Sequence, residues 1–127
     1  MLLLTAFALG AAALGDPDWR EFDRRQRGWG ETPSEYDAAR IERRGARIRV
    51  WIRYEFMLSG LPDILTTRRV EIDCARRRSA DMEVVISGGT YGDSGGGPYR
   101  RRFYRRLTPV AAGSVEEALA RAVCPGG

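Results

Sequence analysis

Two cysteines, Cys74 and Cys124, constrain the fold of this 127-residue chain more than any other feature. Cys74 ends a run, from Arg69, in which apolar and charged residues alternate as they do in a half-buried β-strand. Cys124 ends a run with the apolar spacing of an amphipathic helix. Each cysteine therefore faces the interior from its own element, and one disulfide would fasten a C-terminal helix to a sheet. The alternative is two buried free thiols.

The C-terminal helix is predicted over residues 114–124. Ser114 and Glu117 have the spacing of a capping box, in which two side chains satisfy backbone N–H groups at the helix start. Pro125 and Gly126 end the helix. One apolar stripe is formed by Val115, Ala118, Leu119, Ala122 and Val123. Eleven residues make a marginal helix in water, so we expect tertiary packing and the disulfide to support it.

Alternating apolar and polar residues predict β-strands in the middle of the chain. The clearest runs cover residues 48–56, 67–75, 82–86 and 99–107. Residues 19–30 predict a short edge strand and a loop. We therefore expect an α+β fold: an antiparallel sheet of about six strands, with the helix packed on one face and tied by the disulfide. The other face, with Arg69, Glu71 and Asp73, is predicted to be open.

The first fifteen residues form an uncharged apolar run that ends in small residues. This pattern is typical of a signal peptide over residues 1–15, and the run is shorter than the roughly 20 residues of a membrane span. Residues 16–127 then form a single domain. We expect a periplasmic or secreted protein without a membrane span, and a disulfide suits such an oxidising compartment.

The chain contains no histidine, which removes the commonest general base and the commonest metal ligand. Residues 92–98, Gly-Asp-Ser-Gly-Gly-Gly-Pro, are similar to the nucleophile segment of trypsin-like serine proteases. A serine without a base is inert, so this segment is interpreted as a glycine-rich loop. The cysteines lie too far apart for a zinc site without histidine. We therefore expect no catalytic residues, no metal and no cofactor.

All 21 basic residues are arginines, balanced by 17 carboxylates to a net charge of +4. The segment from Tyr99 to Arg106 mixes aromatic rings and guanidinium groups, which is a composition that binds polyanions. The candidate polyanion-binding residues are Arg100, Arg101, Arg102, Arg105 and Arg106. A solvated, charged sheet face is the alternative, because only half of these side chains share one face of a strand. No intracellular nucleic acid is expected for an exported protein.

The order of these features resembles the surface-adhesin protein E family of small exported bacterial proteins. The resemblance rests on residues 36–41, 47–52 and 70–74, and on the stretch from Pro109 to Cys124. It implies a flat antiparallel sheet of about six strands crossed by a C-terminal helix on a disulfide. It also implies adhesion to a host matrix protein, although the chain lacks the cysteine that would accept a lipid anchor.

These observations predict an exported, non-enzymatic, adhesin-like protein that binds protein or polyanionic partners. The alternative is a structural or stress-related envelope protein without an adhesive role. Such a protein would bind a partner subunit, or a second copy of itself as a homodimer, through an exposed sheet edge.

Overall fold

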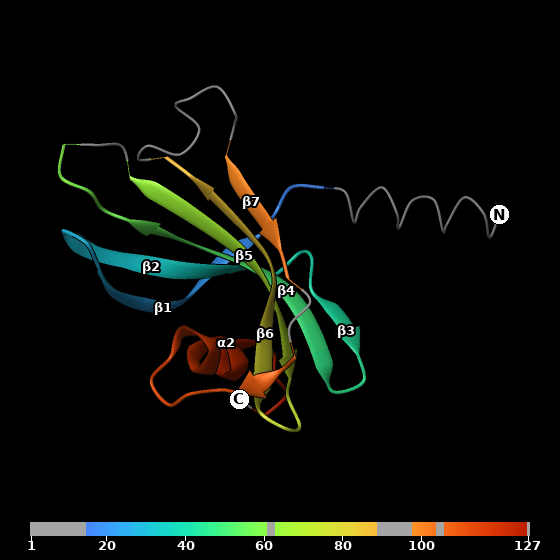
Figure 1. Cartoon of the computed structure of the whole chain (residues 1–127). Coiled ribbons are helices and arrows are strands. Elements are labelled where there is room, and N and C mark those ends of the chain that lie inside the picture. The colour runs from blue at the N-terminus through green and yellow to red at the C-terminus, as the bar shows by residue number, and fades with distance from the viewer. Residues whose placement is uncertain (1–14, 61–62, 89–97, 104–105, 127) are drawn as a thin grey trace.

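A computed structural model describes residues 15–60, 63–88, 98–103 and 106–126. One antiparallel sheet and a C-terminal helix make up the described chain (Figure 1). The strands are β1 (Trp19–Arg27), β2 (Gly30–Asp37), β3 (Glu42–Arg44), β4 (Arg47–Phe56), β5 (Ile64–Asp73), β6 (Arg78–Ser87), β7 (Tyr99–Arg102) and β8 (Thr108–Pro109), and the helix is α2 (Val115–Val123). The sheet order is β1-β2-β4-β5-β6-β7, while β3 pairs with β4 and β8 pairs with β6.

The predicted antiparallel sheet with one C-terminal helix and a disulfide is confirmed, but the predicted number of strands is wrong. The sheet has eight strands rather than about six. Two of them, β3 and β8, are only three and two residues long, so they contain too few residues to show an alternating pattern. Of the strand predicted over residues 99–107, the structure describes β7 up to Arg102, and the next described pairing with β6 is at Thr108.

The central strands β4 and β5 pair along their whole lengths, from Arg47 opposite Asp73 to Phe56 opposite Ile64. Every second residue of β4 is buried at its start, namely Ile48, Val50 and Ile52. This period of two places their side chains on one face and the intervening arginines and Trp51 on the other. The alternation seen in the sequence therefore corresponds to one buried, apolar face and one more exposed, charged face of β4.

The buried face of β4 and β5 shares one hydrophobic core with α2. Leu119, Ala120 and Val123 of the helix belong to the same cluster of buried residues as the inward-facing side chains of these strands. Figure 1 shows the helix at one end of this face, next to the lower halves of the strands. A helix of nine residues is marginal on its own in water, so burial of this kind is the support that it would need.

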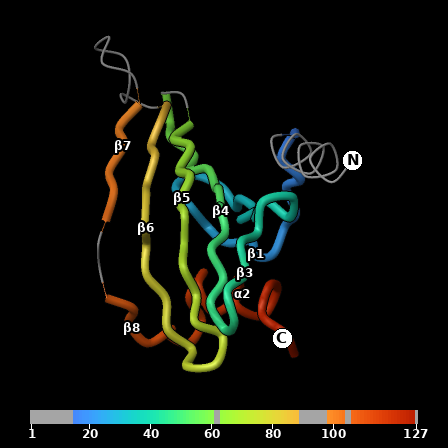
Figure 2. Tube along the Cα trace, turned by 90° about the vertical axis from the view of Figure 1, so that its right-hand side faces the viewer, coloured from blue at the N-terminus to red at the C-terminus, as the bar shows by residue number. Residues whose placement is uncertain are grey.

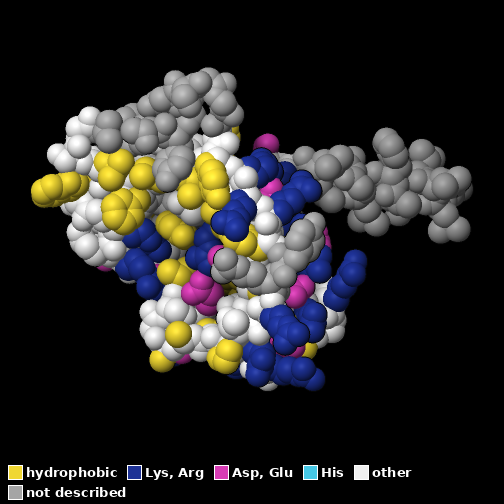
Figure 3. All heavy atoms as spheres, viewed as in Figure 1, with side chains coloured by type: hydrophobic (Ala, Val, Ile, Leu, Met, Phe, Trp, Pro, Cys, Tyr) yellow, Lys and Arg dark blue, Asp and Glu magenta, His cyan; other side chains and the backbone are white. Residues whose placement is uncertain are grey.

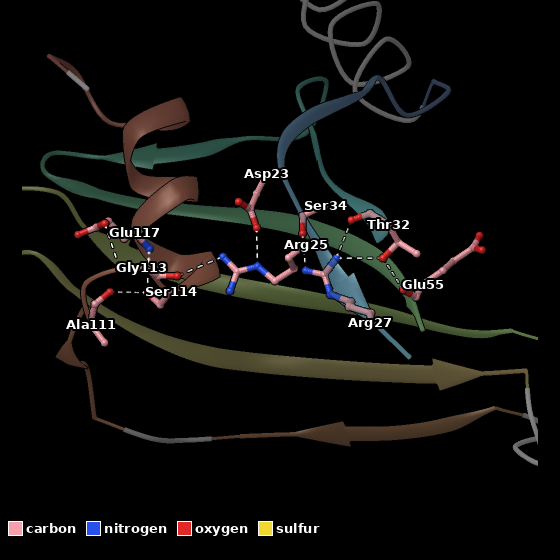
Figure 4. Close-up of polar contacts among 10 residues, drawn as sticks. All are labelled: Asp23, Arg25, Arg27, Thr32, Ser34, Glu55, Ala111, Gly113, Ser114 and Glu117. Carbon is pink, nitrogen blue, oxygen red and sulfur yellow. Dashed lines mark hydrogen bonds and ion pairs between the residues drawn. The ribbon is translucent and has the colours of Figure 1, made fainter. Parts of the chain in front are cut away.

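The helix cap follows the predicted capping residues. The Glu117 N–H donates to Ser114 Oγ at 3.1 Å, while Glu117 Oε1 accepts from the N–H of Gly113, also at 3.1 Å (Figure 4). Glu117 thus reaches back one residue further than the standard capping box, which would pair it with the Ser114 N–H.

The predicted disulfide between Cys74 and Cys124 is present, and it closes a loop of 50 residues. The Cys74 N–H also donates to the Ala46 carbonyl at 2.8 Å, which fixes the turn after β5 against the turn before β4. The alternative of two free thiols is therefore wrong.

One residue assigned to the open face is buried instead. Asp73 is only 6% exposed, because its carboxylate accepts the N–H groups of Ala75 and Arg76 at 3.1 Å each. An aspartate that hydrogen-bonds to the backbone two and three residues ahead stabilises a turn. Asp73 therefore shapes the β5–β6 turn.

The two predictions for the N-terminal part of the chain have different outcomes. The edge strand predicted within residues 19–30 is present but extends over nine residues as β1. Residues 1–14, which hold nearly all of the predicted signal peptide, lie outside the described residues. Among the elements that are described, no helix has the length and apolarity needed to cross a membrane.

Candidate anion-binding surface

The arginines predicted to bind a polyanion do not share one surface. Arg100 and Arg102 lie on the face opposite the core, where Arg100 Nη1 is 2.5 Å and Arg102 Nε is 4.0 Å from Glu83 Oε1. Arg101 points to the other side of β7, and its guanidinium lies 5.1 Å from the centre of the Phe103 ring. Arg106 lies near the start of α2, and Arg105 is outside the described residues. Their binding role stays a prediction.

A pocket of about 260 Å³ lies beside Arg106, between β6, β8 and the start of the helix. Its central cation is Arg68, which forms ion pairs of 2.6 Å with both Asp81 and Glu116. Burial by itself lowers the pKa of Arg68, but Tyr54 and the two carboxylates outweigh burial and raise the pKa further above its ordinary value. Arg68 is therefore a permanent cation whose charge is already neutralised, and it joins α2 to β6.

Glu116 has the complementary shift. Burial alone raises the pKa of its carboxyl, but hydrogen bonds from Arg68, from the backbone and from Ser114 act the other way and lower the pKa below 4.5. The Arg68–Glu116 contact is thus an ionised pair at neutral pH, and its role is structural.

A different set of arginines gathers where two tight turns meet. The β3–β4 turn is flanked by Arg43, Arg44 and Arg47, and the β5–β6 turn carries Arg76, Arg77 and Arg78; we call these six residues the arginine end. Figure 2 shows that both turns lie at the same end of the sheet. In Figure 3, arginine side chains gather at this end, over the ends of β3 to β6.

Strand register explains why the two turns lie together. Arg44 pairs with Arg47, Arg47 pairs with Asp73, and Asp73 pairs with Arg78. Residues that pair in register point to the same face, so three arginines and one aspartate form a single row across four strands. Because Asp73 is buried in its turn, the exposed part of this row is cationic.

The charges of the arginine end are poorly balanced by nearby acids. All six side chains are exposed. Arg47 lies 3.7 Å from Glu71, which also binds Arg49, and Arg43 donates to the Val123 carbonyl at 3.1 Å. Within the described chain, Arg44, Arg76 and Arg78 form no ion pair with a carboxylate. Exposed guanidinium groups without acidic partners are available to an anionic ligand.

Another arginine, Arg27, is buried with neutral partners. It donates to the Thr32 carbonyl and hydroxyl at 3.1 Å and to the Ser34 hydroxyl at 2.6 Å (Figure 4). Its guanidinium lies 4.2 Å from the Tyr54 ring centre. Burial lowers the pKa of Arg27. Its donors are used within the β1–β2 hairpin, so Arg27 contributes to packing and lies apart from the arginine end.

The described residues contain no cluster of three or more acidic, cysteine or histidine side chains that suits a metal ion. The arginine end offers positive charge and hydrogen-bond donors. Guanidinium groups bind carboxylate, sulfate and phosphate oxygens through paired N–H donors.

The Arg43–Arg44 and Arg76–Arg78 segments lie far apart in the sequence. In consecutive antiparallel hairpins, every second turn lies at the same end of the sheet. That rule, applied to the predicted strands, is the signal that would have brought these arginines together.

No family model, no curated protein and no solved structure matches this chain.

Proposed function

We propose that this protein is an exported, non-enzymatic binding domain that holds a polyanionic partner at its arginine end. The main support is that two arginine-bearing turns lie side by side at one end of the sheet. In these turns Arg44, Arg76 and Arg78 have no acidic partner among the described residues. Multivalent anions bind such a surface by releasing counterions, which gives strong and salt-dependent attraction.

Export is supported by two independent features. The Cys74–Cys124 disulfide is compatible with an oxidising compartment, where such bonds form and persist. The apolar N-terminal run has the composition of a signal peptide. Together they favour a periplasmic or secreted location.

Kinship with the surface-adhesin protein E family is part of the same proposal. The order of the sequence stretches supports it, as do the antiparallel sheet and the disulfide between strand β5 and the C-terminal helix. Adhesion to a sulfated or carboxylated matrix polymer would be consistent both with the resemblance to this family and with the positive charge of the arginine end.

Stable packing of α2 on one face of the sheet is the remaining part of the proposal. Support comes from the shared core cluster, from the Arg68–Glu116 ion pair, and from the hydrogen bond between Arg25 Nη2 and the Gly113 carbonyl at 3.3 Å. If the helix packs in this way, the opposite face and the arginine end are left for partners.

The proposal is tested by binding of the mature protein to immobilised heparin, which is a sulfated polysaccharide. We expect the triple variant Arg44→Gln/Arg76→Gln/Arg78→Gln to lose about tenfold or more in affinity at low salt. The matched control, Arg20→Gln/Arg24→Gln/Arg121→Gln, removes the same charge away from the arginine end and should lose about threefold or less, since each of these arginines is paired with a nearby carboxylate. Equal losses in both variants, or no binding by the natural protein, would refute the proposal.

A second candidate function uses the edge of the sheet. The sheet order ends at β7, which pairs only with β6 within the described chain, so one side of this strand is left for another backbone. An envelope protein that binds a partner subunit or a second copy would use this edge. Light scattering across a range of protein concentrations would detect a homodimer. The Phe103 N–H donates inward to the Met82 carbonyl, so the neighbouring Arg102 N–H points to the open edge, and Arg102→Pro should abolish the dimer. A monomer at every concentration argues against self-pairing.

A further inference from the structure

A groove of about 470 Å³ crosses the sheet on the face opposite the core. Trp51 lines it from β4, between the buried residues Val50 and Ile52 in the sequence, so its indole points away from the core. A volume of this size lies in the usual range of small-molecule sites. The groove is separate from the arginine end, which lies at the β3–β4 and β5–β6 turns.

The floor of the groove is made by small side chains between larger ones. Thr67, Val85 and Arg100 line the groove and pair in register across β5, β6 and β7, in a row that Arg53 of β4 continues. Thr67 and Val85, in the middle of this row, are short, while the two arginines that flank them are long. These two arginines lie three strand spacings apart, about 14 Å. This geometry suits an extended ligand that lies across the strands.

Two tryptophans give one end of the groove an aromatic lining. Trp19, from β1, lines the same groove as Trp51, and the Arg53 guanidinium stacks 4.2 Å from the Trp19 ring centre. Arg53 is held in turn by Glu35 at 3.0 Å, so the Trp19 indole is fixed in place. Indole rings offer a large, flat apolar surface with one polar N–H, and they lose little conformational entropy on binding.

Both ends of the groove carry cations whose acidic partners are already in use. At one end Arg40 lies 3.2 Å from Asp37, which is 1% exposed and also accepts the N–H groups of Asp18 and Ala39. At the other end Arg100 shares Glu83 with Arg102, so these three side chains carry a net positive charge. Carboxylates on a ligand would meet N–H donors at each end.

We infer that this groove binds an oligosaccharide of acidic sugars. The flat apolar faces of the sugar rings stack on the indoles of Trp51 and Trp19, and ring carboxylates accept hydrogen bonds from Arg40 and Arg100. The inference goes beyond the proposed function, because it names a second site, a ring-stacking mechanism and a ligand class that charge alone does not select.

The experiment compares three probes of equal length by isothermal titration calorimetry. Tetragalacturonate carries both rings and carboxylates, cellotetraose carries rings without charge, and a blocked tetraglutamate peptide carries charge without rings. We expect saturable binding of tetragalacturonate that is about tenfold or more tighter than binding of either control. If tetraglutamate binds equally well, charge alone is sufficient; if cellotetraose binds equally well, the carboxylates are not needed. If tetragalacturonate does not bind, the groove is not a binding site for acidic sugars. Each of these results overturns the inference.

Two substitutions place the binding in the groove. Trp51→Ala removes the stacking surface, and Thr67→Arg fills the floor without removing a ring; each should weaken tetragalacturonate binding about tenfold. The control Trp29→Ala removes an indole from the β1–β2 turn, where it is 77% exposed and outside the groove, and should leave binding unchanged. Circular dichroism verifies that each variant is folded. Wild-type affinity in both groove variants would contradict the inference.

The failure of this inference is distinguishable from the failure of the proposed function. The variant Arg44→Gln/Arg76→Gln/Arg78→Gln should lose heparin binding and keep its affinity for tetragalacturonate. Loss of both ligands in that variant would mean that the groove is not an independent site.

Discussion

At the scale of single residues, position decides whether an arginine is structural or available. Arg68 and Arg27 are largely surrounded by their own partners, acidic for Arg68 and neutral for Arg27. Arg44, Arg76 and Arg78 are exposed and lack acidic partners within the described residues. Arginine residues therefore stabilise the fold at some positions and are exposed to solvent at others.

The lowered pKa of Glu116 makes part of the stability dependent on pH. The folded state favours the ionised carboxylate of Glu116. The Arg68–Glu116 pair therefore contributes fully to the free energy of unfolding at pH values above the ordinary pKa of a glutamate. This contribution is lost as the pH falls through the lower pKa that Glu116 has in the folded protein. We expect Glu116→Gln to lower the free energy of unfolding at pH 7 by about 1–3 kcal/mol, because a hydrogen bond to a charged group is lost.

Chemical denaturation of both proteins between pH 7 and pH 2 measures this effect. The difference between wild type and Glu116→Gln should stay constant down to about the ordinary pKa of a glutamate and shrink below it. A difference that stays constant to pH 2 would mean that the Glu116 carboxylate does not contribute through its charge.

At the scale of elements, two hairpin turns of the sheet depend on glycines with a left-handed backbone conformation. Gly28, between β1 and β2, has φ = +70°, and a Cβ at this position would lie 2.0 Å from the Met57 carbonyl oxygen. Gly45, between β3 and β4, has φ = +59°, but a Cβ there meets nothing within 4 Å. The two glycines share a left-handed backbone and differ in available space.

This difference predicts unequal costs for two alanine substitutions. Gly45→Ala should lower the free energy of unfolding by about 1–2 kcal/mol, which is the cost of a left-handed conformation for a residue with a Cβ. Gly28→Ala should cost more, because the hydrogen bond between the Trp29 N–H and the Met57 carbonyl must move as well. Urea unfolding measures both; equal costs would mean that the close approach to Met57 does not constrain the turn.

Elements were predictable from sequence where their signals are local and long enough. The predicted helix, residues 114–124, matches α2 and its two capping residues because Ser114, Glu117 and Pro125 mark its ends. The length of β1 was not predictable, since a register shift between Glu21 and Asp23 interrupts its alternation. The arginine end was missed because its two turns become neighbours only through the pairing of β4 with β5.

At the scale of the whole molecule, the disulfide joins the last element to the middle of the chain. The 50-residue loop between Cys74 and Cys124 contains β6, β7, β8 and α2. Closing a loop of this length removes conformational entropy from the unfolded chain worth about 4 kcal/mol in the simple loop model. In a domain of this size, that value is a large part of the total stability.

We therefore expect the double variant Cys74→Ser/Cys124→Ser to lose about 2–4 kcal/mol of unfolding free energy. Hydrogen exchange should show the largest loss of protection in α2, because the helix is short and joined to the sheet at its C-terminal end. Uniform loss of protection across β4, β5 and α2 would mean that the helix and sheet unfold as one unit.

The central claim, that the arginine end holds a polyanion, is tested most directly by the salt dependence of heparin binding. The slope of the logarithm of the association constant against the logarithm of salt concentration counts the ionic contacts. The variant Arg44→Gln/Arg76→Gln/Arg78→Gln should reduce the magnitude of that slope by about 2–3, and the control Arg20→Gln/Arg24→Gln/Arg121→Gln should reduce it by about 1 or less. An unchanged slope in the first variant, or the larger reduction in the second, would contradict the account.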